Sequence, residues 1–212
     1  MKISTSVEPD EFTDFVAQAF DLEFDGTITT DIPEFEQPES DSYNIGMIVG
    51  ASGSGKSQIL KSYFSTTDGH VCRPSPEWSA DKAIVSHFSS PAEAVERLFA
   101  CGVASVPTMC KPYHVLSNGE KYRAAIARLL DDHMVLDEFT SEVNRETAKS
   151  LSVALSKYIR RKDIKNVVLA SCHKDIIDWV EPDWVFDCDS GQRFDNTDPR
   201  ILMKKAARIE IY

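Results

Sequence analysis

The chain has 212 residues, a formal net charge of −11 and 42% hydrophobic residues, an apolar fraction that excludes wholesale disorder. No apolar run approaches the ~18–20 residues that cross a bilayer, and no apolar stretch follows Lys2 as in a secretory signal. We therefore expect a cytoplasmic protein without membrane insertion. The five cysteines contain no C-x-x-C pair, which disfavours a zinc site or a disulfide framework.

The negative charge is concentrated in residues 1–44. This segment holds twelve acidic side chains and one basic one, which gives −11, whereas the rest of the chain holds 22 of each sign. A segment this acidic is not expected to lie on nucleic acid or on an anionic membrane, so any role near nucleic acid is indirect. We divide the chain into an acidic N-terminal helix and lead-in segment (1–44), a central domain (45–190) and a C-terminal segment that packs on the core (191–212).

Residues 9–24 predict an amphipathic helix, with Pro9 in its first turn. Its apolar side chains recur at helical spacing, with acids on the other face: Phe12, Phe15, Val16, Ala19 and Phe20. Such a helix more often docks on its own domain, and the alternative is a helix that binds a partner. Residues 27–32 (TITTDI) predict a short strand inside an acidic, proline-containing lead-in.

From residue 45 onward, short β-rich runs alternate with helical patterns. The predicted strands are 45–49, 83–88, 134–136, 167–171, 184–188 and 208–212. The predicted helices are 57–64, 91–99, 120–130, 146–161 and 174–180. This alternation is typical of an α/β fold with a mixed, partly parallel sheet.

A phosphate-binding loop follows the first of these strands. Gly50-Ala-Ser-Gly-Ser-Gly-Lys-Ser57 fits the pattern G-x-x-x-x-G-K-[ST], with a strand before it and a helix after it. The glycines let backbone N–H groups surround a polyphosphate, Lys56 reaches the β- and γ-phosphates, and Ser57 supplies an oxygen to Mg²⁺. The sequence therefore predicts that ATP and Mg²⁺ are the cofactors. The expected nucleotide-binding residues are Gly50, Ser52, Gly53, Ser54, Gly55, Lys56, Ser57 and Gln58.

Two later strands end in side chains suited to nucleotide chemistry. The strand before Asp137 and Glu138 ends in two carboxylates, and the strand before His173 ends in a histidine. Asp137 is placed to hold Mg²⁺, Glu138 to polarise the attacking water, and His173 to sense the γ-phosphate. Paired carboxylates alone are as often a solvated strand end, but the preceding phosphate loop favours the chemical interpretation.

The order of these motifs resembles that of an ABC-type ATPase, over residues 45–187. Ser117-Asn-Gly119 resembles the LSGGQ signature, Asp137–Ser141 (DEFTS) resembles the D-E-P-T-S run, and His173 resembles the switch histidine. The resemblance implies a P-loop NTPase core with a reduced helical subdomain at about residues 89–130. It also implies that Lys56, Glu138 and His173 are catalytic.

The same resemblance implies a homodimer that closes around two Mg-ATP molecules. The magnesium ligands implied are Ser57 and Asp137. The signature residues would contact the ATP that is held by the opposite subunit, and they are Ser117, Asn118, Gly119 and Glu120. ATP-driven closure, hydrolysis and opening would then drive a conformational change in an unidentified protein partner.

The sequence departs from the family pattern at three places. His87 stands near the position of a metal-binding glutamine, so it is a candidate metal ligand, with an ordinary packed or exposed histidine as the alternative. Asn144 replaces an aspartate in the loop that contacts the opposing subunit. The segment between His87 and Leu116 is too short for a transporter-coupling subdomain or a long coiled-coil insertion.

The motif strings look closest to compact ABC ATPases that occur alone, or fused to a predicted acetyltransferase, in phages and bacteria. We therefore expect a soluble ATPase that serves a partner, which would be an acetyltransferase-like nucleic-acid modification system. The alternatives are the nucleotide-binding subunit of an ABC transporter and a non-hydrolysing switch or scaffold. Three aromatic residues are candidates for the adenine platform, with core packing favoured for the first: Phe24, Phe35 and Tyr43.

Overall fold

The structure is a computed structural model that describes residues 2–64 and 76–196. The chain forms two compact units, Met1–Glu34 and Phe35–Tyr212. Each unit has its own sheet, with two strands in the first and five in the second. No helix in the described ranges is long and apolar enough to span a bilayer. The strand predicted at 208–212 lies outside the described residues.

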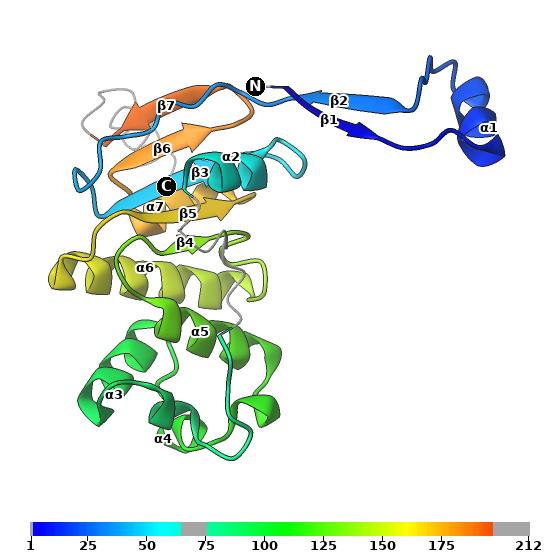
Figure 1. Ribbon diagram of the computed structural model, residues 1–212. Helices are drawn as coiled ribbons and strands as arrows, with labels where there is room; N and C mark the ends of the chain where they lie inside the picture. Colours follow the sequence, from blue (N-terminus) through cyan, green and yellow to red (C-terminus); the bar gives the residue numbers. More distant parts are fainter. Residues whose placement is uncertain (1, 65–75, 197–212) are drawn as a thin grey trace. The chain divides into compact units, whose positions relative to one another are not determined.

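The N-terminal unit is a two-stranded ribbon with a helix between its strands (Figure 1). Strands β1 (Lys2–Ser6) and β2 (Thr27–Asp31) pair antiparallel. The predicted strand at 27–32 is thus confirmed as β2, and β1 is an additional strand. The predicted helix is confirmed as α1 (Glu11–Ala19), which begins after Asp10 because the carboxylate of Asp10 accepts a hydrogen bond from the N–H of Thr13.

Helix α1 buries none of its residues. The exposed fractions of Phe12, Phe15 and Phe20 are 72%, 74% and 79%. Within the first unit, the ribbon strands KISTS and TITTD offer the helix only Ile3 and Ile28 as apolar partners. The expectation that the helix docks on its own domain, with a partner-binding helix as the alternative, stays a prediction.

The second unit is built on a sheet whose mixed, partly parallel character was predicted, and which has five strands among the described residues. Its strands are β3 (Ile45–Val49), β4 (Val135–Leu136), β5 (Val167–Ser171), β6 (Trp184–Asp187) and β7 (Gln192–Asp195). The spatial order is β4-β5-β3-β6-β7, in which the first four strands are parallel and β7 pairs antiparallel with β6. The central strands β3 and β5 are buried along their whole length, as their continuous apolar runs predict.

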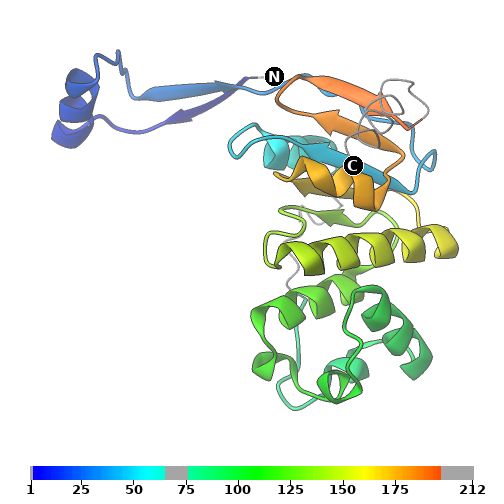
Figure 2. The same cartoon turned by 180° about the vertical axis from the view of Figure 1, so that it is seen from behind.

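Helices cover the sheet and form a separate arm beyond it. The helices of this unit are α2 (Lys56–Tyr63), α3 (Pro91–Ala100), α4 (Val106–Met109), α5 (Asn118–Leu129), α6 (Arg145–Lys162) and α7 (Ile177–Val180). Short 3₁₀ helices are η1 (Ile84–His87), η2 (Tyr113–Val115) and η3 (Lys174–Ile176). Helix α6 lies between the sheet and the arm formed by α3, α4 and α5 in both views (Figures 1 and 2).

Helix α6 shows why the layers hold together. Ala148, Leu151, Leu155 and Ile159 recur at helical spacing and are all buried. Asn144 caps the helix start by accepting from the N–H of Thr147, and three basic residues occupy the last turn, where they suit the helix dipole. The buried side chains of the sheet, α6 and the arm form one continuous cluster. The arm is therefore an extension of the same hydrophobic core.

The strand predicted at 83–88 is wrong. Residues Ile84–His87 form the 3₁₀ helix η1, and only Ala83 makes an isolated bridge, to Pro112. The imidazole of His87 explains the difference, because one ring nitrogen bonds the carbonyl of Ala83 and the other accepts from the N–H of Ser79. These local side-chain bonds satisfy backbone groups that a strand would otherwise pair.

Gly46, on β3, marks the tightest packing in the sheet. A Cβ at this position would lie 2.0 Å from Cζ2 and 2.1 Å from Cε2 of Trp184, whose side chain is buried. We expect Gly46→Ala to lower the free energy of unfolding by about 1–3 kcal/mol, because an enclosed indole has no space into which to move. Urea unfolding measures this effect. The double variant Gly46→Ala/Trp184→Phe should recover part of the loss, and an unchanged unfolding midpoint in Gly46→Ala would contradict the packing argument.

Candidate functional site

The phosphate loop connects β3 to α2 through glycines in conformations that other residues rarely adopt. Gly55 precedes α2 with φ 93°, and Gly50 has φ 154°. A Cβ at Gly50 would lie 2.5 Å from Oγ of Ser54 and 2.9 Å from Cβ of Cys188. The loop is therefore closed on itself at the start of a helix, where backbone N–H groups and the helix dipole favour an anion.

Lys56 spans this loop. It is the first residue of α2 and is buried, with 9% of its surface exposed. Its Nζ donates to the carbonyl oxygens of Gly50 (2.8 Å) and Ala51 (2.7 Å). These bonds hold a positive charge against the loop, where a phosphate group would need it.

Ser57 and Asp137 meet although they lie far apart in the sequence. Oγ of Ser57 donates to Oδ2 of Asp137 at 2.6 Å. Strand β4, which precedes Asp137, and strand β3, which precedes the phosphate loop, both run parallel to β5, so their carboxyl ends share one edge of the sheet. A hydroxyl and a carboxylate at this distance supply the oxygen ligands that Mg²⁺ prefers, so the donor set fits that ion.

Residues Asp137–Ser141, the carboxylate loop, hold Glu138 in an unusual backbone conformation. Glu138 has φ 54° and Thr140 has φ 72°. Between them, Phe139 is buried and its N–H donates to the carbonyl of Ala170 on β5 (2.7 Å). Left-handed conformations at non-glycine residues cost about 1–3 kcal/mol each and gather at functional sites. Anchored by Phe139, the loop keeps Glu138 at the exposed edge of the sheet.

His173 lies at the same edge. It lies two residues beyond Ser171, the last residue of β5, which pairs with Val49, the last residue of β3. Its imidazole is exposed, and its backbone N–H donates to Oγ of Ser171 (3.1 Å). The carboxyl ends of β3, β4 and β5 thus carry the phosphate loop, the two carboxylates and the histidine to one side of the sheet.

A charged cluster braces the phosphate loop from the end of β6. The N–H of Ala51 donates to Oδ1 of Asp189 (2.9 Å), and Nζ of Lys174 contacts Asp187 and Asp189, each at 2.9 Å. The N–H of Ala51, followed by Lys174, lowers the pKa of Asp189 below its usual value. Sequence reasoning missed this cluster. The available signals were two acids, one ending β6 and one just after it, and a lysine beside His173.

The signature segment starts α5, with Ser117 as the N-cap. Its backbone N–H (3.0 Å) and its Oγ (2.8 Å) both donate to Oε2 of Glu120, and its Oγ accepts from the N–H of Glu120. The backbone N–H and then the hydroxyl of Ser117 lower the pKa of the Glu120 carboxyl. Ser117 and Asn118 are exposed, and a Cβ at Gly119 would meet its nearest neighbour only at 3.8 Å. The helix start is therefore an accessible surface with partial positive charge.

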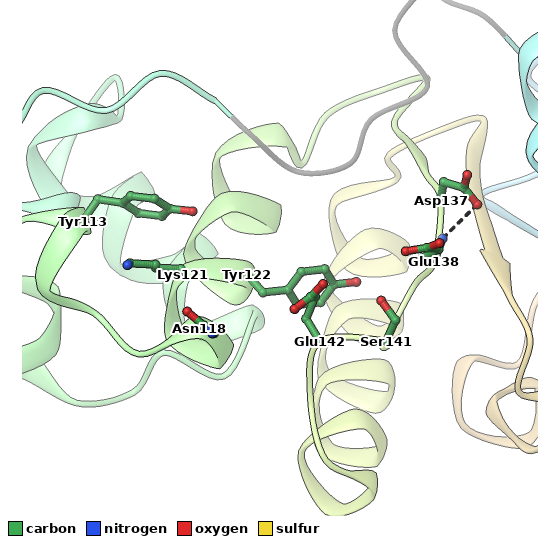
Figure 3. Close-up of a pocket in the computed structure, with 8 residues that line it drawn as sticks. All are labelled: Tyr113, Asn118, Lys121, Tyr122, Asp137, Glu138, Ser141 and Glu142. Atoms are coloured by element: carbon green, nitrogen blue, oxygen red, sulfur yellow. Dashed lines mark hydrogen bonds between the residues drawn. The ribbon is translucent and has the colours of Figure 1, made fainter.

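A cavity of about 230 Å³ separates α5 from the carboxylate loop (Figure 3). Its lining residues are Tyr113, Asn118, Lys121, Tyr122, Asp137, Glu138, Ser141 and Glu142. Tyr113 and the residues of α5 form one wall, and the carboxylates with Ser141 form the other (Figure 3). The signature segment and the carboxylate pair of one chain therefore face a common space.

Three sequence candidates in the second unit do not join this site. His87 uses both ring nitrogens on backbone partners and packs edge-on against Trp78, with ring centroids 4.9 Å apart, so the structure does not bring it to Ser57. Phe35 and Tyr43 are buried and both pack against Trp184. Neither offers a free ring face to adenine. Phe24 is half-buried in the N-terminal unit.

No protein-family model matches the sequence, and no curated protein matches it. Among solved structures, cbiO1 from Clostridium perfringens, part of the ABC transporter complex cbiONQ, aligns with a TM-score of 0.54 at 19% identity, covering 86% of each chain. A dimeric structure of MJ0796, a bacterial ABC transporter cassette, aligns with a TM-score of 0.50 at 14% identity, covering 82% of this chain and 90% of that one. A structure of MJ0796 bound to ADP and Pi aligns with a TM-score of 0.49 at 15% identity, covering 82% of this chain and 90% of that one. The expected fold class is confirmed: this chain has the α/β P-loop fold of an ABC ATPase.

Proposed function

We propose that this protein is an ATPase that binds Mg-ATP, dimerises around two ATP molecules and uses hydrolysis to change the conformation of a protein partner. The observation that carries the proposal is the 2.6 Å contact between Ser57 and Asp137, because it joins the phosphate loop to the strand that ends in Glu138. The expected metal ligand, Asp137, and the expected base, Glu138, are adjacent in the sequence. This spacing suits the hydrolysis of a terminal phosphate by water.

The side chains divide the chemistry among them. Lys56 and the N–H groups of the phosphate loop neutralise and orient the β- and γ-phosphates. Ser57 and Asp137 would hold the magnesium ion, which when bound neutralises charge on the phosphate oxygens. Glu138 accepts a proton from the attacking water, and His173 contacts the γ-phosphate from the next strand end. Phosphate and ADP are then the products.

Dimer formation follows from the position of the signature segment. Ser117 begins a helix that has no phosphate loop beside it in sequence, yet its start is exposed. MJ0796, one of the solved structures with this fold, is described as a dimeric cassette. We infer that the start of α5 completes the ATP site of a second copy. The γ-phosphate would then stabilise the dimer by binding both chains at once.

The partner is proposed to be a soluble protein in the cytoplasm, of the acetyltransferase-like nucleic-acid modification class. The alternative of a transporter subunit is favoured by cbiO1, which is part of an ABC transporter complex. The first proposal rests on the short segment between His87 and Leu116, which in the resembled family is longer where it couples to transporter helices. A non-hydrolysing switch is less consistent with the retained Glu138 and Lys56.

Light scattering of the Glu138→Gln chain tests the proposal. Without nucleotide this variant should have the 23.7 kDa mass of one chain, and with Mg-ATP the mass should double, because unhydrolysed ATP keeps the dimer closed. Adding Ser117→Arg should block the dimer by filling the anion site, while ATP binding by the single chain remains.

Ser90→Arg is the matched control, since Ser90 caps α3 as Ser117 caps α5 and each substitution removes one N-cap. In the Glu138→Gln background, Ser90→Arg should dimerise normally with Mg-ATP. Dimerisation of the Ser117→Arg chain with Mg-ATP would overturn the sandwich arrangement and favour the switch or scaffold alternative.

A further inference from the structure

Tyr122 connects α5 to the carboxylate loop. It lies one turn beyond the N-cap Ser117, and its side chain is buried, with 7% exposed. Its Oη accepts a hydrogen bond from the backbone N–H of Thr140 at 3.0 Å. The ring thus extends from the signature helix to the loop that carries Glu138 (Figure 3). Burial raises the pKa of Tyr122 far above its usual range, so the phenol stays protonated at neutral pH.

The loop at the other end of this bond is strained. Thr140 is β-branched and has φ 72°, a conformation that such residues rarely adopt. Its Oγ1 is buried and finds no hydrogen-bond partner among the described residues. Two unfavourable features at one residue mark a conformation that neighbouring contacts must hold in place. The contacts around it include the anchor of Phe139 on β5, the bond from Thr140 to Tyr122, and backbone bonds from Ser141 to Glu138 and from Val143 to Thr140.

We propose that Tyr122 is a positioning residue that couples the start of α5 to the placement of Glu138. This inference rests on the proposed function, in which the start of α5 binds the ATP of a second chain. When that ATP engages Ser117, a shift of α5 carries the Tyr122 hydroxyl with it. Because the hydroxyl holds the N–H of Thr140, the shift reaches a strained loop two residues from the base. Hydrolysis is thereby linked to closure of the dimer.

The arrangement has the parts that such coupling requires. A strained segment held by few contacts can exist in two discrete arrangements, and a rigid aromatic ring transmits displacement without bending. The cavity of about 230 Å³ between α5 and the loop leaves space for Glu138 to change position. Tyr122 lines this cavity on one side and Glu138 on the other.

Steady-state kinetics of Tyr122→Phe tests the proposal, because this change removes only the hydroxyl. We expect kcat to fall about tenfold, as a buried N–H loses its acceptor and the loop loses its support, while KM changes less than about twofold. In the Glu138→Gln background, Tyr122→Phe should still dimerise with Mg-ATP. Tyr158→Phe is the matched control, since Tyr158 on α6 is equally buried, with 6% exposed, and its loss should leave kcat unchanged.

A second variant separates coupling from a general loss of structure. Glycine adopts φ 72° without strain, so in a Thr140→Gly chain the loop depends less on the tyrosine hydroxyl, although the N–H of residue 140 remains. Adding Tyr122→Phe to Thr140→Gly should therefore lower kcat by a clearly smaller factor than Tyr122→Phe alone. If the fold-loss in kcat of the double variant equals the product of the losses in Tyr122→Phe and Thr140→Gly, Tyr122 does not act through Thr140 and the coupling is overturned.

The remaining outcomes distinguish this inference from the function on which it rests. If Glu138→Gln dimerises with Mg-ATP but Tyr122→Phe has an unchanged kcat, the proposed function stands and the coupling is overturned. Loss of ATP-driven dimerisation in Tyr122→Phe would show that the hydroxyl merely supports the fold of α5, which also overturns it. A Glu138→Gln chain that stays monomeric with Mg-ATP overturns the proposed function and the coupling together.

Discussion

Replacing Glu138 with glutamine is expected to lower the steady-state rate of ATP hydrolysis by about 10²–10⁴-fold, because an amide cannot accept the proton of the attacking water. The affinity for Mg-ATP should stay close to that of the unmodified chain, since Glu138 is exposed at the sheet edge and the phosphate loop holds the nucleotide. Release of inorganic phosphate under saturating Mg-ATP measures the rate. Equilibrium titration with labelled ATP measures the affinity.

Glu146→Gln is a suitable control for this experiment. Glu146 is exposed in the first turn of α6, so the substitution removes the same charge without touching the carboxylate loop. It should leave hydrolysis unchanged. Near-normal hydrolysis in Glu138→Gln would show that another group is the base, and His173 would then be the first candidate because it lies at the neighbouring strand end.

Replacing Lys56 with alanine is expected to raise the dissociation constant for ATP by about 10–100-fold and to abolish hydrolysis. The loss corresponds to about 1.5–3 kcal/mol for a charge-assisted hydrogen bond to phosphate. The same change removes the ammonium that donates to the carbonyl oxygens of Gly50 and Ala51, so the phosphate loop also loses two internal hydrogen bonds. Titration with labelled ATP measures this effect.

Lys61→Ala separates the local role of Lys56 from a general effect of positive charge. Lys61 is exposed in the last turn of the same helix, α2, and its removal should leave ATP affinity unchanged. Equal affinity of the Lys56→Ala chain and the unmodified chain would remove Lys56 from the role assigned to it.

The sequence predicts most accurately where one physical requirement dominates. Strands β3 and β5 are apolar throughout because both of their faces are covered. The phosphate loop between β3 and α2 is recognisable because its backbone conformation requires glycine at fixed positions. The long helix α6 follows from its buried stripe at helical spacing. The carboxylates and His173 could be placed at one sheet edge because the strands before them are parallel.

Prediction fails where a side chain competes with the backbone or where contacts are remote. The β-rich run at 83–88 suggests a strand, yet it forms a 3₁₀ helix in which the imidazole of His87 bonds the carbonyl of Ala83. The bond between Tyr122 and Thr140 depends on how α5 packs against β4, which local patterns do not specify. The bracing of Ala51 by Asp189 likewise joins segments that only the folded sheet brings together.

The division of the chain into Met1–Glu34 and Phe35–Tyr212 has an evolutionary consequence. Every residue of the phosphate loop, the carboxylate loop and the signature segment belongs to the second unit. The exposed phenylalanines of α1 belong to the first. Under the proposed function, selection for ATP hydrolysis therefore acts directly on the second unit. The first unit can then diverge without altering any of these three segments.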